Sequence, residues 1–479
     1  MILRVINHPY EFDMKNLCIT FFPHEKIRLE GEEDPVVVTT RRETDGSFFV
    51  SAKVYDVYRE TTAKPEPADE EHLVLSVTLY RLLSGILGFA PPWGVLYGVR
   101  PAKLMHRLCA QMGDDAAVAH FQTAFLTQKR KAELAHEVML HENRSIARSG
   151  PKSFSLYVSI PFCPTRCAYC SFVSHSIEKT HKLMTPYVDL LLRELEETSK
   201  YAKELGLELA TVYFGGGTPT TLSAQDLGRI FSTIEQNFDL SHLMEYTVEA
   251  GRPDTVTRER LEVIRAAGVQ RISINPQSFN DKVLEAIGRR HTAQQTLDAF
   301  ALARDCGFDH INMDFIAGLP EDDLPSFQRS IQTALDLQAE SITVHTLALK
   351  TSAYMVTREQ TFDLKDRLTV SNMVDYAGQT LHGAGYYPYY MYRQSKSLGN
   401  LENVGWCKPG YDCLYNVYMM DETHTVLAVG AGAVTKLRGQ NSGMIERIYN
   451  YKYPYEYIRD FDTLLERKKR IPGFYAEYD

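Results

Sequence analysis

Between residues 155 and 346 the sequence alternates short apolar runs with longer segments whose apolar residues recur at helical spacing. The short runs have the length of buried strands, and they cover residues 156–160, 211–214, 246–249, 271–274, 311–316 and 341–346. The amphipathic segments that follow them predict helices over residues 187–205, 224–237, 258–267, 292–306 and 326–337. Strands and helices in this alternation favour a parallel sheet with right-handed crossovers. We therefore predict an α/β fold built on a partial (β/α)6 TIM-like barrel.

The flanking regions lack this rhythm. Short β-rich runs, at 36–40 and 48–57, precede residue 60, and a mostly helical stretch then continues to about residue 149. A helix predicted over 366–383 is followed by an aromatic-rich stretch. We expect an α+β N-terminal domain at 1–150, the barrel at 151–365 and a mainly helical C-terminal segment at 366–479.

Composition narrows the class of protein. The 479 residues carry a net charge of −9, and basic residues cluster only briefly, at 467–470, so a nucleic-acid partner is disfavoured. The longest apolar stretch, around residues 73–92, is interrupted by Arg81, so we expect no membrane span. The N-terminus has no charged region followed by an apolar run, which favours a cytoplasmic location. Eight cysteines are too few for a disulfide scaffold of this length.

Three of those cysteines form the strongest chemical signal. They lie in Cys163-Pro-Thr-Arg-Cys167-Ala-Tyr-Cys170, directly after the first predicted barrel strand. Three thiolates on one short loop can hold three irons of a [4Fe–4S] cluster. The fourth iron is then open to a chelating cofactor, and S-adenosylmethionine (SAM) is such a cofactor. The alternative is a zinc site with His175 as its fourth ligand.

Further candidate residues lie at the ends of later strands. Gly215-Gly-Gly-Thr-Pro-Thr220 follows the second strand, where glycines allow close backbone approach and can expose amides to a ligand such as SAM. Glu249 ends the third strand, Gln277 follows the fourth and Asp314 lies within the fifth. Because the carboxyl ends of barrel strands meet at one rim, these side chains could hydrogen-bond a ribose or an amino acid.

Four segments together resemble the oxygen-independent coproporphyrinogen III oxidase family of radical SAM proteins. They are Tyr157-Val-Ser-Ile-Pro-Phe-Cys163 with its two partner cysteines, the glycine segment at 215–220, Asn275-Pro-Gln-Ser-Phe-Asn280 and Asp314-Phe-Ile-Ala-Gly-Leu-Pro320. The sequence looks most like the HemZ-type branch, whose members carry a long N-terminal extension like the one here with its Trp93–Pro101 stretch.

The resemblance implies a radical SAM barrel, a set of ligands and a reaction. Tyr157, Gly216 and Glu249 would contact the cluster-bound SAM. In the family's oxidases a second SAM lies beside the first, and its contacts match Tyr169, Gly217, Thr218, Gln277, Arg289, Asp314 and Ala348. The implied activity is that of an oxidoreductase, the oxidative decarboxylation of two propionates of coproporphyrinogen III to vinyl groups in haem biosynthesis. Its implied partners are a tetrapyrrole substrate and an electron donor such as flavodoxin or ferredoxin.

Two positions depart from the family's patterns. The oxidases have a further cysteine two residues after the third ligand, where this chain has Phe172, as the haem chaperone branch also does. The chaperones carry a C-terminal HNxxYW motif, where this chain reads Tyr415-Asn-Val-Tyr-Met-Met420. A haem chaperone, or another radical reaction on a tetrapyrrole such as methylation with ring opening, is therefore an alternative. Candidate porphyrin contacts outside the family motifs are Arg100, Arg393 and the aromatic run at 386–392.

Overall fold

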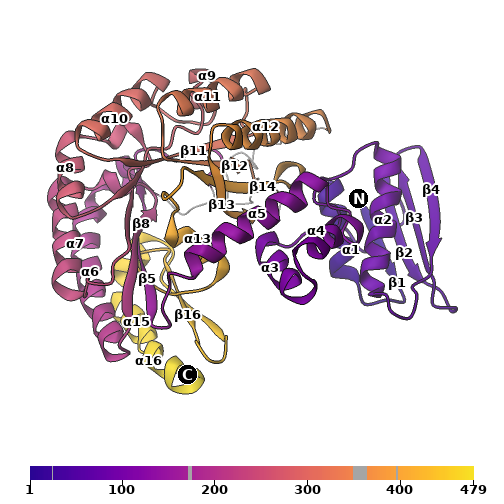
Figure 1. The fold of residues 1–479 in the computed structure, drawn as a ribbon, viewed down its shortest axis with the longest axis horizontal. Helices are drawn as coiled ribbons and strands as arrows, with labels where there is room; N and C mark the ends of the chain where they lie inside the picture. The colour runs from indigo at the N-terminus through magenta and orange to yellow at the C-terminus, as the bar shows by residue number, and fades with distance from the viewer. Residues whose placement is uncertain (24, 171–174, 349–363, 395–396) are drawn as a thin grey trace.

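The computed structural model describes residues 1–23, 25–170, 175–348, 364–394 and 397–479. Its elements fall into a small N-terminal sheet with helices, a connecting helical region and a large sheet covered by helices (Figure 1). No helix in this described part of the chain is long and apolar enough to cross a membrane.

The N-terminal sheet has the order β1–β2–β3–β4, with β1 parallel to β2 and the other pairs antiparallel. Its elements are β1 (Ile2–Ile6), α1 (Glu11–Phe21), β2 (Val36–Arg42), β3 (Phe48–Val54), β4 (Val57–Ala63) and α2 (Glu71–Leu87). The predicted run 48–57 is broken by a tight turn at Tyr55, whose φ of 52° reverses the chain between β3 and β4. Val38 and Val50 pack against Leu75 and Leu79 of α2.

A helical region joins this sheet to the barrel. It contains α3 (Pro101–Met112), α4 (Asp114–Thr123) and α5 (Lys129–Ile146). Buried Lys131 of α5 forms ion pairs with Asp375 at 3.1 Å and with Glu402. Glu402 also accepts a hydrogen bond from the indole of buried Trp93 at 2.7 Å. Because breaking a buried ion pair is costly, this network ties α5 firmly to the C-terminal segment.

The barrel follows the predicted βα alternation. Its elements are β5 (Ser153–Ile160), β6 (Phe162–Cys163), β7 (His175–Ser176), α6 (Ile177–Glu204), β8 (Glu208–Gly216), α7 (Ala224–Asn237), β9 (Glu245–Glu249), α8 (Arg258–Ala266), β10 (Arg271–Ser273), α9 (Asp281–Ala286), α10 (Ala293–Asp305), β11 (His310–Ala317), α11 (Leu324–Asp336) and β12 (Ser341–Thr346). Strands β5, β8, β9, β10, β11 and β12 pair in parallel in that order. Side chains cap the first turns of several of these helices. The Ser223 side chain accepts a hydrogen bond from the first turn of α7, and Thr292 and Gln295 form a capping box at the start of α10.

In the C-terminal segment more of the described residues lie in helices than in strands, in line with the predicted mainly helical segment, and its strands extend the barrel sheet. Its elements are α12 (Leu364–Gly383), β13 (Tyr387–Arg393), β14 (Glu402–Cys407), α13 (Leu414–Asp421), β15 (Thr425–Val429), β16 (Val434–Arg438), β17 (Ile445–Tyr449), α14 (Pro454–Arg459), α15 (Phe461–Lys468) and α16 (Arg470–Tyr478). Strand β14 pairs with β12 at one edge, and β15 pairs with β5 at the other. Within the described residues the sheet therefore stays open, which confirms a partial barrel.

A second buried ion pair fastens the chain's end to the barrel. Lys468 of α15 lies 2.7 Å from Glu194 of α6, and both side chains are fully buried. Glu194 also accepts hydrogen bonds from Tyr457 at 2.6 Å, from Asn450 at 2.8 Å and from the backbone amide of Gly430 at 2.7 Å. This set of donors compensates for the removal of the carboxylate from water.

Candidate functional site

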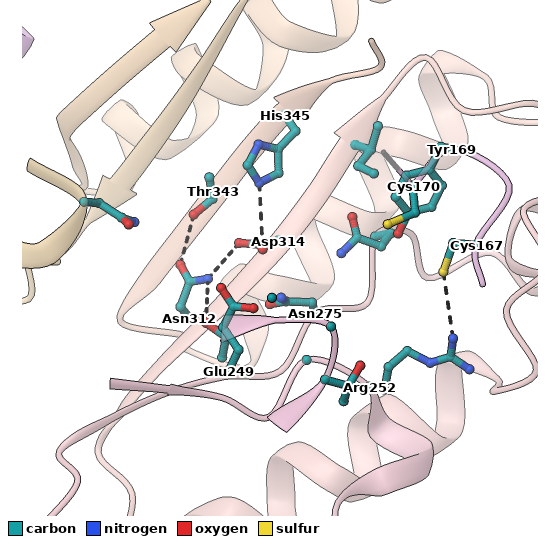
Figure 2. Close-up of a pocket in the computed structure, with 18 of the residues that line it drawn as sticks. Cys167, Tyr169, Cys170, Glu249, Arg252, Asn275, Asn312, Asp314, Thr343 and His345 are labelled. Atoms are coloured by element: carbon teal, nitrogen blue, oxygen red, sulfur yellow. Dashed lines mark hydrogen bonds and ion pairs between the residues drawn. The ribbon is translucent and has the colours of Figure 1, made fainter. Parts of the chain in front are cut away.

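A cavity of about 400 Å³ opens at the carboxyl ends of the parallel strands. Figure 2 shows Cys167 and Cys170 at one side of it, and Glu249 of β9, Asp314 of β11 and His345 of β12 at the other. The predicted site residues that line it are Cys163, Cys167, Tyr169, Cys170, Gly216, Gly217, Thr218, Glu249, Gln277, Arg289, Asp314 and Ala348. The fold thus brings side chains spread over almost 190 positions of sequence together around one cavity.

The remaining predicted residue, Tyr157, lies on β5 beside this cavity. Its ring is stacked against Tyr213 with centroids 6.3 Å apart and against Tyr415 with centroids 6.0 Å apart. Tyr213 and Tyr415 do line the cavity. Tyr157 therefore supports the wall through these two rings, and a direct contact of Tyr157 with SAM stays a prediction.

The cysteine loop is surrounded by donors that suit thiolates. Thr218 donates its hydroxyl to the sulfur of Cys163 at 3.4 Å, and Arg252 donates from Nη1 to the sulfur of Cys167 at 3.8 Å (Figure 2). The backbone amide of Cys170 donates a hydrogen bond to the backbone carbonyl of Cys167 at 3.1 Å. Hydrogen bonds to cysteine sulfurs stabilise negative charge and tune iron–sulfur centres. The residues present therefore fit the cluster that the spacing predicts.

The zinc alternative is not supported by the position of His175. This residue is not among the described residues that line the cavity. Its ring instead packs edge-on against Tyr453 and Tyr455, with centroids 5.7 Å and 6.3 Å away. Phe172, where the oxidases have a further cysteine, lies outside the described residues.

The glycine segment after β8 has mainly a packing role. A Cβ at Gly217 would lie 2.6 Å from the carbonyl oxygen of Phe162, so only glycine lets the segment approach the cysteine loop. The amide of Gly217 donates to the carbonyl of Ile160, and the amide of Thr218 donates to that of Phe162, each at 2.7 Å. These two amides are therefore not exposed to a ligand, contrary to the expectation from the glycine run.

Two carboxylates in the cavity differ in their proton affinity. Burial raises the pKa of Glu249 to about 7, although Tyr213 donates its hydroxyl to Glu249 at 2.6 Å and lowers the pKa. Burial also acts on Asp314, but contacts with His345 at 3.7 Å and with the Asn312 amide at 2.8 Å hold the Asp314 pKa below its usual value (Figure 2). Asp314 is thus ionised at neutral pH, while Glu249 is poised to gain or lose a proton there.

Gln277, Tyr169 and Arg289 connect the cysteine loop to the later strands. Arg289 donates from Nη1 to the carbonyl of Asn275 at 2.6 Å and from Nη2 to the Tyr169 hydroxyl at 3.2 Å. Gln277 has a φ of 68°, and its backbone amide donates a hydrogen bond to the backbone carbonyl of Asp314 at 2.9 Å. Each of these two sets of contacts joins a pair of predicted SAM residues, Arg289 with Tyr169 and Gln277 with Asp314.

Arg271, which the sequence analysis did not single out as a site residue, is a buried cation of the cavity with unsatisfied N–H groups. It is only 1% exposed, yet it lines the cavity from the first position of β10. Its guanidinium makes no hydrogen bond to any described residue, and its Nε and Nη1 are buried without a partner. Although burial acts to lower it, the pKa of Arg271 is raised above its usual value by electrostatic interaction with neighbours that include Glu245, so its charge is partly balanced through space. Its unsatisfied N–H groups still favour an anionic or water hydrogen-bond acceptor in the cavity. The available signal was an arginine facing inward from an apolar strand.

The two arginines proposed as propionate contacts lie elsewhere. Arg100 pairs with Glu422 at 2.5 Å, and buried Arg393 donates to the Leu96 carbonyl at 2.7 Å while stacking over Trp93. Neither belongs to the described lining of the cavity, so the cavity gives that expectation no support. The aromatic run contributes in part, through Tyr390 and Tyr392, which do line it.

Comparison with known proteins agrees with this geometry. Residues 157–334 match the radical SAM superfamily. The oxygen-independent coproporphyrinogen-III oxidase-like protein HemZ of Bacillus subtilis (strain 168) is 34% identical, over 95% of this chain and 94% of that protein. The heme chaperone HemW of the same organism is 31% identical, over 64% of this chain and 79% of that protein. In fold, coproporphyrinogen III oxidase HemN from Escherichia coli is similar, with a TM-score of 0.51 at 22% identity over 68% of this chain and 72% of that chain.

Proposed function

Because this chain belongs to the oxygen-independent coproporphyrinogen-III oxidase-like family of radical SAM proteins, we propose that it decarboxylates two propionates of coproporphyrinogen III to vinyl groups. The product would be protoporphyrinogen IX, made without oxygen for haem biosynthesis. The observation that carries this proposal is Arg271, a buried cation with unsatisfied N–H groups in the cavity that also holds the three cysteines. A substrate that brings carboxylates into this cavity can supply the missing hydrogen-bond acceptor.

The family implies a [4Fe–4S] cluster and SAM, and the cysteine loop provides the cluster ligands Cys163, Cys167 and Cys170. When bound, the cluster and SAM supply a one-electron cleavage that generates a 5′-deoxyadenosyl radical. The hydrogen bonds from Arg252 to the Cys167 sulfur and from Thr218 to the Cys163 sulfur would stabilise the negative charge of the thiolates. We assign the SAM contacts to the residues that the family resemblance indicates and that line the cavity.

Arg271 is proposed to bind and orient the substrate. A guanidinium binds a carboxylate through two parallel hydrogen bonds, and such a pair is strong where water is excluded. The substrate carbon next to the tetrapyrrole ring loses one hydrogen atom, and the bond to the carboxylate carbon then breaks. Carbon dioxide leaves, the vinyl double bond forms, and one electron passes to a one-electron acceptor. Holding the carboxylate fixes which carbon faces the radical.

The carboxylates of the wall are proposed to bind SAM. The ionised oxygens of Glu249 and Asp314 can accept hydrogen bonds from an amino group or from ribose hydroxyls. Tyr213 holds Glu249 in place through the 2.6 Å hydrogen bond, and His345 and Asn312 hold Asp314. Positioning of this kind limits the directions in which a reactive radical can move.

A second candidate function is haem handling. It is favoured by the 31% identity to the heme chaperone HemW and by Phe172, where the oxidases have cysteine. A chaperone would bind haem stoichiometrically and would not convert coproporphyrinogen III. The two functions are therefore separable by product analysis.

The test uses full-length protein reconstituted with its cluster under anaerobic conditions, with dithionite, SAM and coproporphyrinogen III. We expect vinyl-containing product by chromatography. Arg271→Gln should raise the KM for coproporphyrinogen III about tenfold or more, because a charge-assisted hydrogen bond is lost. The exposed Arg258 provides the control variant Arg258→Gln. Stoichiometric haem binding without vinyl product would reject the oxidase function in favour of haem handling.

A further inference from the structure

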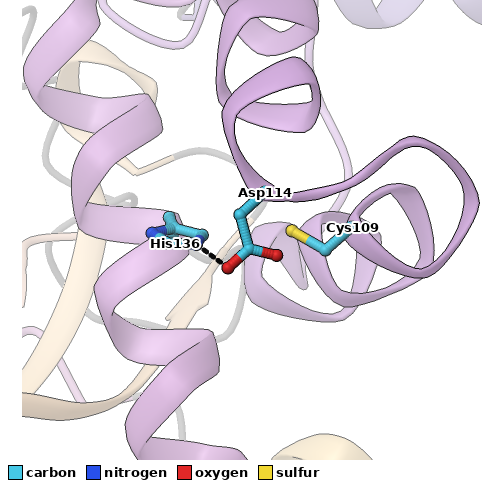
Figure 3. Close-up of side chains that lie close together, drawn as sticks. All are labelled: Cys109, Asp114 and His136. Carbon is cyan, nitrogen blue, oxygen red and sulfur yellow. Dashed lines mark hydrogen bonds and ion pairs between the residues drawn. The ribbon is translucent and has the colours of Figure 1, made fainter.

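Three side chains of metal-ligand type meet on the helical region, outside the barrel cavity. Cys109 lies in the last turn of α3, Asp114 is the first residue of α4, and His136 lies on α5. Figure 3 shows the three side chains pointing toward one another from the three helices. The Cys109 sulfur, a carboxylate oxygen of Asp114 and an imidazole nitrogen of His136 all lie within 4.8 Å of one another.

The local sequence brings the first two ligands together. Only Gly113 separates α3 from α4, and its φ of +85° is a conformation that other residues rarely adopt. The chain therefore turns at Gly113 between Cys109 and Asp114, and both side chains lie near His136 of α5. Helices α3 and α4 each pack against α5, which supplies His136.

The donor set selects the class of metal. A thiolate, an imidazole and a carboxylate together are typical ligands of zinc, whereas calcium and magnesium take sets of oxygen ligands. Zinc sites are commonly tetrahedral, with metal–ligand distances of about 2.0–2.3 Å, so their ligand atoms lie about 3–4 Å apart. The Asp114 and His136 atoms, 3.0 Å apart, are already at that spacing. Asp114 is 55% exposed, so solvent can supply a fourth ligand.

The charges of the ligands suit the metal. A thiolate, a neutral imidazole, a carboxylate and Zn²⁺ sum to zero, so a bound zinc ion leaves no net charge among the helices.

We propose that Cys109, Asp114 and His136 form a zinc site that clamps the α3–α4 turn to α5. Helix α5 is itself anchored to the C-terminal segment through the ion pairs of Lys131 with Asp375 and Glu402, and β14, which carries Glu402, extends the barrel sheet. The metal thus fixes the helical region on an element that already belongs to the barrel's framework. The site is separate from the cysteine loop and does not depend on the proposed oxidase reaction.

The test measures zinc bound by the full-length protein with its iron–sulfur cluster in place. The protein is equilibrated anaerobically with Zn²⁺ alone and a competing chromophoric chelator, and zinc per chain is measured by mass spectrometry. We expect one zinc per chain, with affinity lowered about tenfold or more in Cys109→Ser and in His136→Gln. Cys306→Ser is the matched control, since Cys306 is another half-buried cysteine at a helix end.

A second measurement uses Co²⁺ in a full-length Cys163→Ala, Cys167→Ala, Cys170→Ala background, which lacks the cluster's absorption. Thiolate-to-cobalt charge transfer and tetrahedral ligand-field bands are expected there, and Cys109→Ser should abolish them while far-ultraviolet circular dichroism stays unchanged. Absence of retained zinc in the wild type, or equal zinc affinity in the wild type and both variants of the triad, would overturn the proposal and leave a hydrogen-bonded cluster only.

Discussion

Replacing Tyr213 with phenylalanine should shift the pH at which SAM binding is lost. The Tyr213 hydroxyl donates to Glu249 at 2.6 Å and stabilises the carboxylate form, while burial sets the Glu249 pKa at about 7. A hydrogen bond to a charged group contributes about 1.5–3 kcal/mol, and about 1.4 kcal/mol corresponds to one pKa unit. Tyr213→Phe should therefore raise the Glu249 pKa by at least about one unit.

The sign of the effect follows from the form that binds. If the carboxylate of Glu249 binds SAM, affinity falls as pH falls through the Glu249 pKa. At pH 7.5 a one-unit rise lowers the ionised fraction from about three quarters to about one quarter, which weakens SAM binding about threefold. At pH 9.5 both proteins are ionised at Glu249, and their affinities should converge.

The assay is anaerobic equilibrium dialysis of SAM between pH 6 and 9.5. Tyr390→Phe is the control, because Tyr390 lines the same cavity and donates no hydrogen bond to Glu249 among the described contacts. An unchanged midpoint in Tyr213→Phe, or a loss of affinity that is equal at every pH, would refute the role given to Glu249.

Two further predictions concern the framework of the site. Lys468→Met leaves Glu194 buried without its cation and should lower the free energy of unfolding by about 3–5 kcal/mol in urea denaturation. Lys469→Met, at an exposed position, should change it little, and equal losses would contradict the account. Gly217→Ala places a methyl group 2.6 Å from a backbone oxygen and should lower the iron and sulfide content of the reconstituted protein. Gly383→Ala meets no atom within 4 Å and is the control, so full iron loading of Gly217→Ala would count against the packing argument.

The barrel could be predicted because each βα unit carries its own pattern. Strand β12 and helix α7 have the predicted bounds, and the other predicted barrel elements are displaced mostly by a few residues. Helix α9 is too short to show a helical period over its six residues. Strands β13 to β17 could not be placed from local pattern, because β15 pairs with β5, some 270 positions away. The boundaries of the three predicted domains stay a prediction.

The part of the site that could be predicted is the set of residues that lie close together in the sequence. Cys163, Cys167 and Cys170 follow one another on one loop, so their convergence is local. Arg271 and Arg393 are the opposite case, since an arginine's partner is fixed by the fold. Arg393 stacks over Trp93, about 300 positions earlier, whereas Arg271 faces the cavity with no side-chain hydrogen bond to any residue that the structure describes.

The most direct test of the proposed reaction follows hydrogen from substrate to cofactor product. Coproporphyrinogen III carrying deuterium on the propionate carbons next to the ring is incubated anaerobically with the reconstituted protein, SAM and dithionite. We predict one deuterium in each 5′-deoxyadenosine formed with a vinyl group, and neither product from Cys167→Ala. Unlabelled 5′-deoxyadenosine, formed without vinyl product, would contradict the account.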